Sequence, residues 1–151
     1  MDDGIGRAFV DAFCERARAG VKVQLHLDAL GSLAFSFSNA AGVLEGAGVE
    51  LKWFNPARFN RLLKLNRRNH RKLLVVDGGH AWLGGFNVHE ECSFKHCGEE
   101  CWRDTQVYIR GPLAATMAEY FDQLWRGKRR WRPPEDPEAD TFIISNHNLR
   151  Q

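Results

Sequence analysis

The chain has 151 residues, of which 44% are hydrophobic, and its formal net charge is +2. This size allows one domain with a real core and excludes two full domains. The nearly balanced charge favours no class of polyanionic partner. No apolar run approaches the roughly 20 residues of a membrane-spanning helix. The opening Met1-Asp2-Asp3 is not the start of a secretory signal.

The first third of the chain alternates predicted helices and strands. Residues 4–20 have helical periodicity, residues 21–28 alternate as a strand, residues 32–46 are a less regular helical stretch, and residues 49–54 form a second strand. This order predicts an α/β fold in which helices flank a mixed sheet that is at least partly parallel.

The segment 55–68 interleaves cations with large apolar residues. It has two interpretations: a solvated loop with a few leucines turned inward, or an interfacial segment that meets anionic lipid headgroups. The cations are Arg58, Arg61, Lys64, Arg67 and Arg68, and the apolar residues are Phe59, Leu62, Leu63 and Leu65.

Two short apolar runs, at residues 73–76 and 81–86, flank the turn signal Asp77-Gly78-Gly79. This pattern predicts an antiparallel β-hairpin. With Gly78 and Gly79 as the turn residues, Lys72 lies opposite Gly85 and His70 opposite Asn87. Because side chains alternate between faces, these four residues share one face, where an imidazole, an ammonium and an amide can bind a phosphate ester. Asp77 falls on the other face, as a turn or supporting group.

The spacing of His70-x-Lys72, Asp77 and Gly84-Gly85-x-Asn87 resembles the signature of the phospholipase D superfamily. The sequence of residues 66–78, Asn-Arg-Arg-Asn-His-Arg-Lys-Leu-Leu-Val-Val-Asp-Gly, is similar to that of the bacterial cardiolipin synthase branch. Gly85 stands where much of the superfamily has Ser, and the Gly-Gly version is familiar in the cardiolipin synthase branch.

The resemblance implies a mechanism without metal or cofactor. His70 attacks phosphorus and forms a phosphohistidine, Lys72 and Asn87 bind phosphate oxygens, and Gly85 leaves room for the ester. A second histidine from an equivalent half protonates the leaving alcohol. This chain has one such signature, so the resemblance also implies a second half, in cis or by dimerisation.

Residues 102–110 read as another strand, followed by Gly111-Pro112. In the superfamily an acidic residue at the start of this strand holds the nucleophilic histidine, and by position that residue is Asp104. The alternative is a strand-end carboxylate paired with Arg103 or Arg110.

Three of the four cysteines lie close together in the sequence. Cys92 and Cys97 fall in a predicted polar loop, residues 88–100, and Cys101 follows it directly. The set His89, Cys92, His96, Cys97 and Cys101 invites a zinc interpretation. Its spacing fits no standard Cys-x2-Cys knuckle. We therefore favour reduced thiols in a surface loop of a cytosol-facing protein.

The last part of the chain begins with a clear helix at residues 113–125. A basic cluster follows at 126–132, either a solvated helix end or a membrane-docking surface. We expect residues 1–134 to form one catalytic half-domain, and residues 135–151 to form a linker and the first strand of a second half.

The leading hypothesis is a phosphatidyltransferase half that acts on a phosphatidylglycerol-like lipid. It predicts a peripheral position at an anionic membrane surface, on the cytoplasmic face, and no nucleic-acid partner. One alternative is a homodimeric nuclease or phosphodiesterase of the same superfamily. The other is a domain that binds anionic lipid without turnover.

Overall fold

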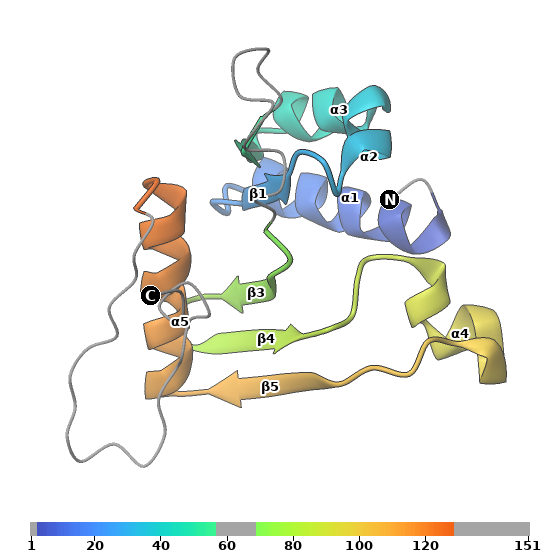
Figure 1. Ribbon diagram of the computed structural model, residues 1–151. Coiled ribbons are helices and arrows are strands. Elements are labelled where there is room, and N and C mark those ends of the chain that lie inside the picture. The colour runs from blue at the N-terminus through green and yellow to red at the C-terminus, as the bar shows by residue number, and fades with distance from the viewer. Residues whose placement is uncertain (1–2, 57–68, 129–151) are drawn as a thin grey trace. The chain divides into compact units, whose positions relative to one another are not determined.

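A computed structural model of the chain describes residues 3–56 and 69–128. The helices and strands, most of them labelled in Figure 1, are α1 (Gly4–Arg18), β1 (Gln24–Asp28), α2 (Leu33–Phe37), α3 (Ala40–Gly46), β2 (Glu50–Phe54), β3 (Lys72–Val76), β4 (His80–Gly84), η2 (Glu90–Cys92), α4 (Phe94–Cys97), η3 (Gly98–Glu100), β5 (Gln106–Arg110) and α5 (Pro112–Trp125). Each helix and strand predicted within the described residues has a counterpart with shifted ends, except that the helical stretch predicted at 32–46 is two helices. The predictions for residues 57–68 and 129–151 lie outside them.

The chain divides into two compact units. The described residues of the first unit are 3–56, 69–70 and 86–104, and those of the second are 71–85 and 105–128. The strands of the first unit pair in parallel and those of the second unit pair antiparallel. The predicted α/β class with mixed strand pairing is therefore confirmed.

The first unit is built on the parallel pair β1 and β2, in which Gln24 is level with Glu50 and Asp28 with Phe54. Its core contains Val10 and Cys14 of α1, Leu44 of α3, and Val49 just before β2. Leu25, Leu27, Leu51 and Trp53 of the two strands pack against this core. Burial of these side chains fixes the strands against the helices.

The predicted helical stretch 32–46 is two helices, because Ser38 interrupts it. Ser38 has extended backbone, with φ −83° and ψ 159°. Its hydroxyl donates to the Phe35 carbonyl oxygen at 2.8 Å and accepts from the Ala40 N–H at 3.3 Å. A serine hydroxyl thus replaces helical backbone bonds at the end of α2 and the start of α3.

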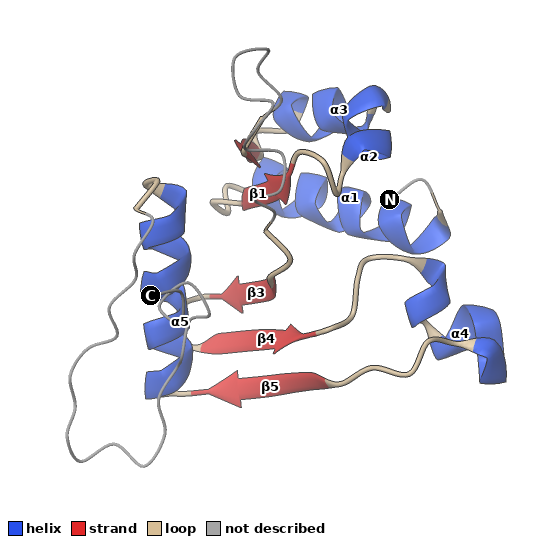
Figure 2. Ribbon diagram, viewed as in Figure 1, coloured by secondary structure: helices blue, strands red, loops and turns tan. Residues whose placement is uncertain are grey.

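The second unit is an antiparallel sheet in the order β3-β4-β5, with α5 running across the strands (Figure 2). Ala114 and Met117 of α5 are buried together with Ala81 of β4. Leu73, Val75, Leu83 and Ile109 pack against them from the sheet. The opposite face of the sheet carries Lys72, Trp82 and Tyr108.

The register of the β3–β4 hairpin differs by one residue from the prediction. Val76 pairs with His80 and Lys72 with Gly84, so the loop has three residues. Asp77 and Gly78 have positive φ, 51° and 63°, and the Gly79 N–H donates to the Val76 carbonyl at 3.3 Å. Asp-Gly therefore occupies the centre of the turn, as type I′ turns favour. Gly79 is the extra residue.

The correction changes the predicted partners of the signature residues. Lys72 is opposite Gly84 and not Gly85. Because β3 begins at Lys72 and β4 ends at Gly84, His70 and Asn87 lie outside the strand ladder. The predicted placement of His70 opposite Asn87 as paired strand residues is therefore wrong.

The predicted polar loop after β4 contains short helical turns and a disulfide. Cys97 and Cys101 are bonded, with their Cα atoms 5.2 Å apart. The prediction that all the thiols are reduced is wrong for this pair, because helix α4 and the turn after it bring two cysteines four positions apart within disulfide reach. Cys14 and Cys92 are unpaired thiols.

Candidate functional site

His70, the proposed nucleophile, is exposed and follows directly after a residue that is fixed by a carboxylate. The backbone N–H of Asn69 donates to Oδ2 of Asp28, the last residue of β1. The other oxygen of Asp28, Oδ1, accepts from the N–H groups of Leu30 at 3.1 Å and Gly31 at 2.8 Å. The first unit therefore ties the chain at residue 69 to the end of a core strand.

Lys72 begins β3 in the second unit and is half-buried. The residue before it, Arg71, places its guanidinium carbon 5.7 Å from the ring centroid of Tyr120 on α5. Tyr120 is only 6% exposed. A guanidinium over an aromatic ring is attracted by the ring's electron-rich face, so Arg71 fixes the start of β3 against α5.

The two glycines after the second strand have different roles. A Cβ built on Gly84 would lie 2.8 Å from the Cα of Gln106 and closer still to the Thr105 carbonyl oxygen. The sheet therefore requires glycine at position 84. Gly85 donates its N–H to the Thr105 carbonyl oxygen at 3.1 Å. This bond extends the pairing of β4 with β5 by one residue.

Asn87 and Asp104 lie at the two ends of the segment 86–104 of the first unit, and both are exposed. Asp104 comes two residues before β5, whereas the sequence placed it inside the strand. Trp102, near the end of the segment, donates its N–H to the Glu91 carbonyl oxygen at 3.0 Å. This bond and the disulfide close the segment on itself.

The same segment is anchored to the start of α1 by a reciprocal arrangement of caps. Asp3 accepts from the Gly6 N–H with Oδ1 at 2.7 Å and from the Glu90 N–H with Oδ2 at 2.8 Å. Glu90 in turn accepts from the Gly4 N–H at 2.7 Å. These bonds satisfy N–H groups of the first helical turn that have no partner within the helix.

The predicted site residues fall into three groups. His70, Asn87 and Asp104 belong to the first unit, and Lys72 and Gly85 belong to the second. Asp77 also belongs to the second unit but lies in the turn at the far end of β3. At 3.3 Å per residue, this is roughly 16 Å along the strand from Lys72. Asp77 and Lys72 therefore cannot both contact one phosphate.

Sequence reasoning missed Asp28. Its position could have identified it, because Asp28 lies at the carboxyl end of a predicted strand, directly before a turn. In α/β sheets with parallel strands, that edge is the usual place for functional groups.

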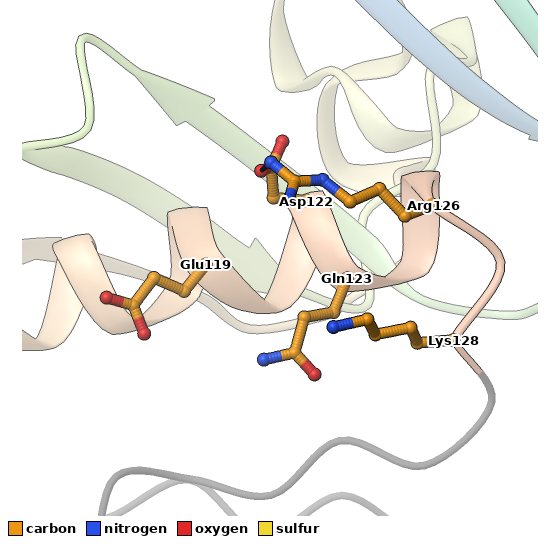
Figure 3. A pocket seen from close by; sticks show the side chains of 5 residues that line it. All are labelled: Glu119, Asp122, Gln123, Arg126 and Lys128. Atoms are coloured by element: carbon orange, nitrogen blue, oxygen red, sulfur yellow. Dashed lines mark hydrogen bonds and ion pairs between the residues drawn. The ribbon is translucent and has the colours of Figure 1, made fainter.

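A hollow of about 200 Å³ lies at the carboxyl end of α5. Glu119, Asp122, Gln123, Arg126 and Lys128 line it (Figure 3). Arg126 pairs with Asp122 one turn earlier at 2.5 Å. The lining carries both signs of charge and none of the predicted site residues, so it is not the predicted phosphate site.

Within residues 3–56 and 69–128, no three His, Cys, Asp or Glu side chains gather in a way that could hold a metal ion. This finding gives the zinc interpretation of residues 89–101 no support. No helix in the same part of the chain is long and apolar enough to cross a bilayer.

Comparison with known proteins gives a consistent result. A family model described as "Cardiolipin synthase, PLD-like domain" matches residues 5–125, which include every predicted site residue. Cardiolipin synthase A of Pseudomonas putida strain GB-1 is 40% identical over 135 residues, 88% of this chain and 28% of that protein. Cardiolipin synthase of Geobacillus kaustophilus is 41% identical over 125 residues, 82% of this chain and 24% of that protein. The chain thus spans about a quarter of the length of these relatives. No solved structure shows a significant match.

Proposed function

Because the chain belongs to the family of cardiolipin synthase PLD-like domains, we propose that it is a catalytic half of a phosphatidyltransferase. The reaction passes through a phosphohistidine at His70. The observation that carries the proposal is the family match over residues 5–125 together with a complete His70-x-Lys72 signature inside it.

The reaction has two displacements at phosphorus. An imidazole nitrogen of His70 attacks the phosphodiester, a P–N bond forms, and the P–O bond to the leaving alcohol breaks. The leaving oxygen takes a proton from a second histidine. An acceptor alcohol then gives its proton to that same histidine and attacks phosphorus, and the P–N bond breaks to release His70. When the acceptor is another lipid's glycerol, the result is phosphatidyl transfer.

Lys72 and Asn87 hold the non-bridging oxygens in this proposal, and Gly85 leaves room beside them. Electrostatic stabilisation of the developing charge is the main catalytic contribution of such groups. One residue separates His70 from Lys72, so their Cα atoms lie within about 7 Å of each other by covalent geometry alone. In the β3–β4 pair Lys72 is opposite Gly84, which directly precedes Gly85 in the sequence.

The two acidic residues have supporting roles. Asp104 accepts a hydrogen bond from the ring of His70 and fixes its orientation, which is the task of a carboxylate beside a catalytic imidazole. Asp77 stabilises the hairpin turn, where its positive φ of 51° suits Asp better than most side chains.

The substrate is a phosphatidylglycerol-like lipid, and the partners are an anionic membrane surface and a second signature half. This chain lies at the membrane surface and works at the cytoplasmic face. The second half supplies the histidine that protonates the leaving alcohol, either from the same polypeptide or from a second copy of this chain.

Phosphatidylglycerol vesicles and an oligonucleotide, each incubated with the protein, test the proposal. Release of glycerol with formation of cardiolipin supports it. Cleavage of the oligonucleotide alone favours the nuclease alternative, and vesicle binding without turnover favours the non-catalytic one. An acid-labile phosphoryl group on the peptide that contains His70 identifies the intermediate.

The matched variants are His70→Ala and His96→Ala. His96 is an exposed histidine on α4, so its loss leaves turnover unchanged. His70→Ala reduces turnover to the level of vesicles without protein. Equal activity in the two variants would contradict the assignment of the nucleophile.

A further inference from the structure

Asp28 is the last residue of β1, a strand that packs against the core of the first unit. β1 is paired along its whole length with β2, and Leu25 and Leu27 pack against the core. The N–H of Ala29, directly after Asp28, donates to the Phe54 carbonyl oxygen at 3.2 Å. The backbone that carries the Asp28 carboxylate is therefore held on both sides of the residue.

The two oxygens of this carboxylate serve different parts of the chain. Oδ1 accepts the local N–H groups of Leu30 and Gly31 and shapes the turn after β1. Oδ2 accepts the N–H of Asn69, which is 41 residues later in the sequence. Hydrogen bonds from backbone N–H to an ionised carboxylate are shorter and stronger than neutral ones.

The distant partner is the residue that precedes His70. Because the Asn69 N–H is held by Asp28, the backbone that leads into His70 is held in place. Arg71, on the other side of His70, is fixed by its contact with Tyr120. The proposed nucleophile thus stands between two residues with defined anchors, although His70 itself is exposed.

We propose that Asp28 is a positioning residue that aims His70 through the Asn69 amide. This inference rests on the proposed function of His70 and adds a residue to it. Asp28 does not touch the substrate. It lowers the barrier by restricting the orientation of the imidazole before attack, since misplacement by 1 Å costs about 10²-fold in rate.

Asp28→Asn separates the two tasks of the side chain. The amide oxygen of Asn accepts the Leu30 and Gly31 N–H groups, so the local turn keeps its partner. The NH2 group at the place of Oδ2 is a donor and cannot accept from Asn69. The substitution therefore releases residue 69 and leaves the end of β1 intact.

The test compares Asp28→Asn with wild type and with Asp11→Asn, which removes one carboxylate from an exposed position on α1. We expect kcat for phosphatidylglycerol to fall by about 10²-fold, KM to stay within about twofold, and the urea midpoint to stay close to wild type. Amide hydrogen exchange at residue 69 becomes faster only in Asp28→Asn. Unchanged kcat and unchanged exchange at residue 69 would overturn the proposal.

Two further outcomes are informative. A parallel loss of kcat and of the urea midpoint would show that Asp28 only stabilises the fold, and would overturn the positioning role. If the wild-type chain by itself turns over no lipid, two copies do not supply each other's second histidine, and the Asn69 tie remains testable. In that case faster exchange at residue 69 and altered His70 ring resonances in Asp28→Asn support the positioning role, and unchanged spectra refute it.

Discussion

Gly84 is a position in the signature at which the packing of the sheet requires glycine. A methyl group at this position would collide with the backbone of Thr105 and Gln106 on the neighbouring segment. We predict that Gly84→Ala lowers the free energy of unfolding by about 1–3 kcal/mol, because β4 and β5 must move apart to admit it. Urea unfolding followed by tryptophan fluorescence measures the change.

Gly46→Ala is the matched control for this substitution. Gly46 is the last residue of α3, and a Cβ built there meets nothing within 4 Å. Alanine is a better helix former than glycine, so the control stabilises the protein by up to about 1 kcal/mol. Equal destabilisation by both substitutions would show that the close approach of Thr105 is not what requires glycine at position 84.

At Asp104 we expect a substitution to lower activity while it leaves the stability of the fold nearly unchanged. Because its side chain is exposed, we predict that Asp104→Asn changes the free energy of unfolding by less than about 0.5 kcal/mol. Turnover of phosphatidylglycerol falls by roughly 10²-fold, since His70 loses the group that orients it. Glu99→Gln, an exposed carboxylate of η3 in the same segment, leaves both unchanged. Losses of activity and stability in proportion would count against the orienting role.

At the scale of elements, the start of α1 is the anchor for the segment that carries Asn87 and Asp104. Burial raises the pKa of Asp3, but hydrogen bonds from the Gly6 and Glu90 N–H groups, helped by nearby His89, outweigh it. The net result is a pKa below the ordinary value of 3.8. Folding therefore favours the ionised form of Asp3.

This shift predicts a stability change with pH. The stabilising effect of the Asp3 charge is fully present above the unfolded-state pKa of 3.8. It is lost as the pH falls through the lower folded-state pKa. The difference in free energy of unfolding between wild type and Asp3→Asn shrinks as the pH falls from about 5 towards 3. Urea titrations at each pH measure it.

The comparison for this titration is Asp11→Asn, which removes an equal charge two turns further along the same helix. We expect its difference from wild type to change less with pH than that of Asp3→Asn, because Asp3 and not Asp11 caps the start of α1. Identical pH dependence in the two variants would contradict the role of the Asp3 cap.

The elements also show what the sequence determines and what it leaves open. The spacing of apolar residues located the strands and helices, as in β1 and α5, because the buried face of each element determines that spacing. It did not give the hairpin register, since Asp77-Gly78 and Gly78-Gly79 are both good turn dipeptides and differ by one residue. Nor did it show that Ser38 would end α2, because a serine inside a helical pattern is tolerated when its hydroxyl has no better partner.

The sequence predicts a set of candidate site residues and does not predict how they are arranged. The signature is a local pattern in the sequence, so its resemblance to the superfamily signature singles out His70, Lys72, Gly85 and Asn87 as predicted site residues. Asp28 is 41 residues from its partner Asn69, and a single hydrogen bond over that separation leaves no periodic signal. Contacts of this kind depend on how β1 ends, which only the folded chain specifies.

At the scale of the whole molecule, the chain has one signature and the proposed reaction needs two histidines. If two copies of this chain form the active species, each site takes its nucleophile from one copy and its acid from the other. We predict that activity per mole rises with protein concentration, by mass action. Gel filtration then shows a species of twice the 17.2 kDa chain mass.

Mixing wild type with His70→Ala distinguishes a shared site from independent ones. In an equimolar mixture that exchanges subunits at random, about one quarter of the dimers have two histidines at position 70, because a C2 dimer pairs copies without preference. A shared site therefore gives about a quarter of the wild-type activity at equal total protein. Independent sites give one half. A measured value of one half would refute the shared dimer site.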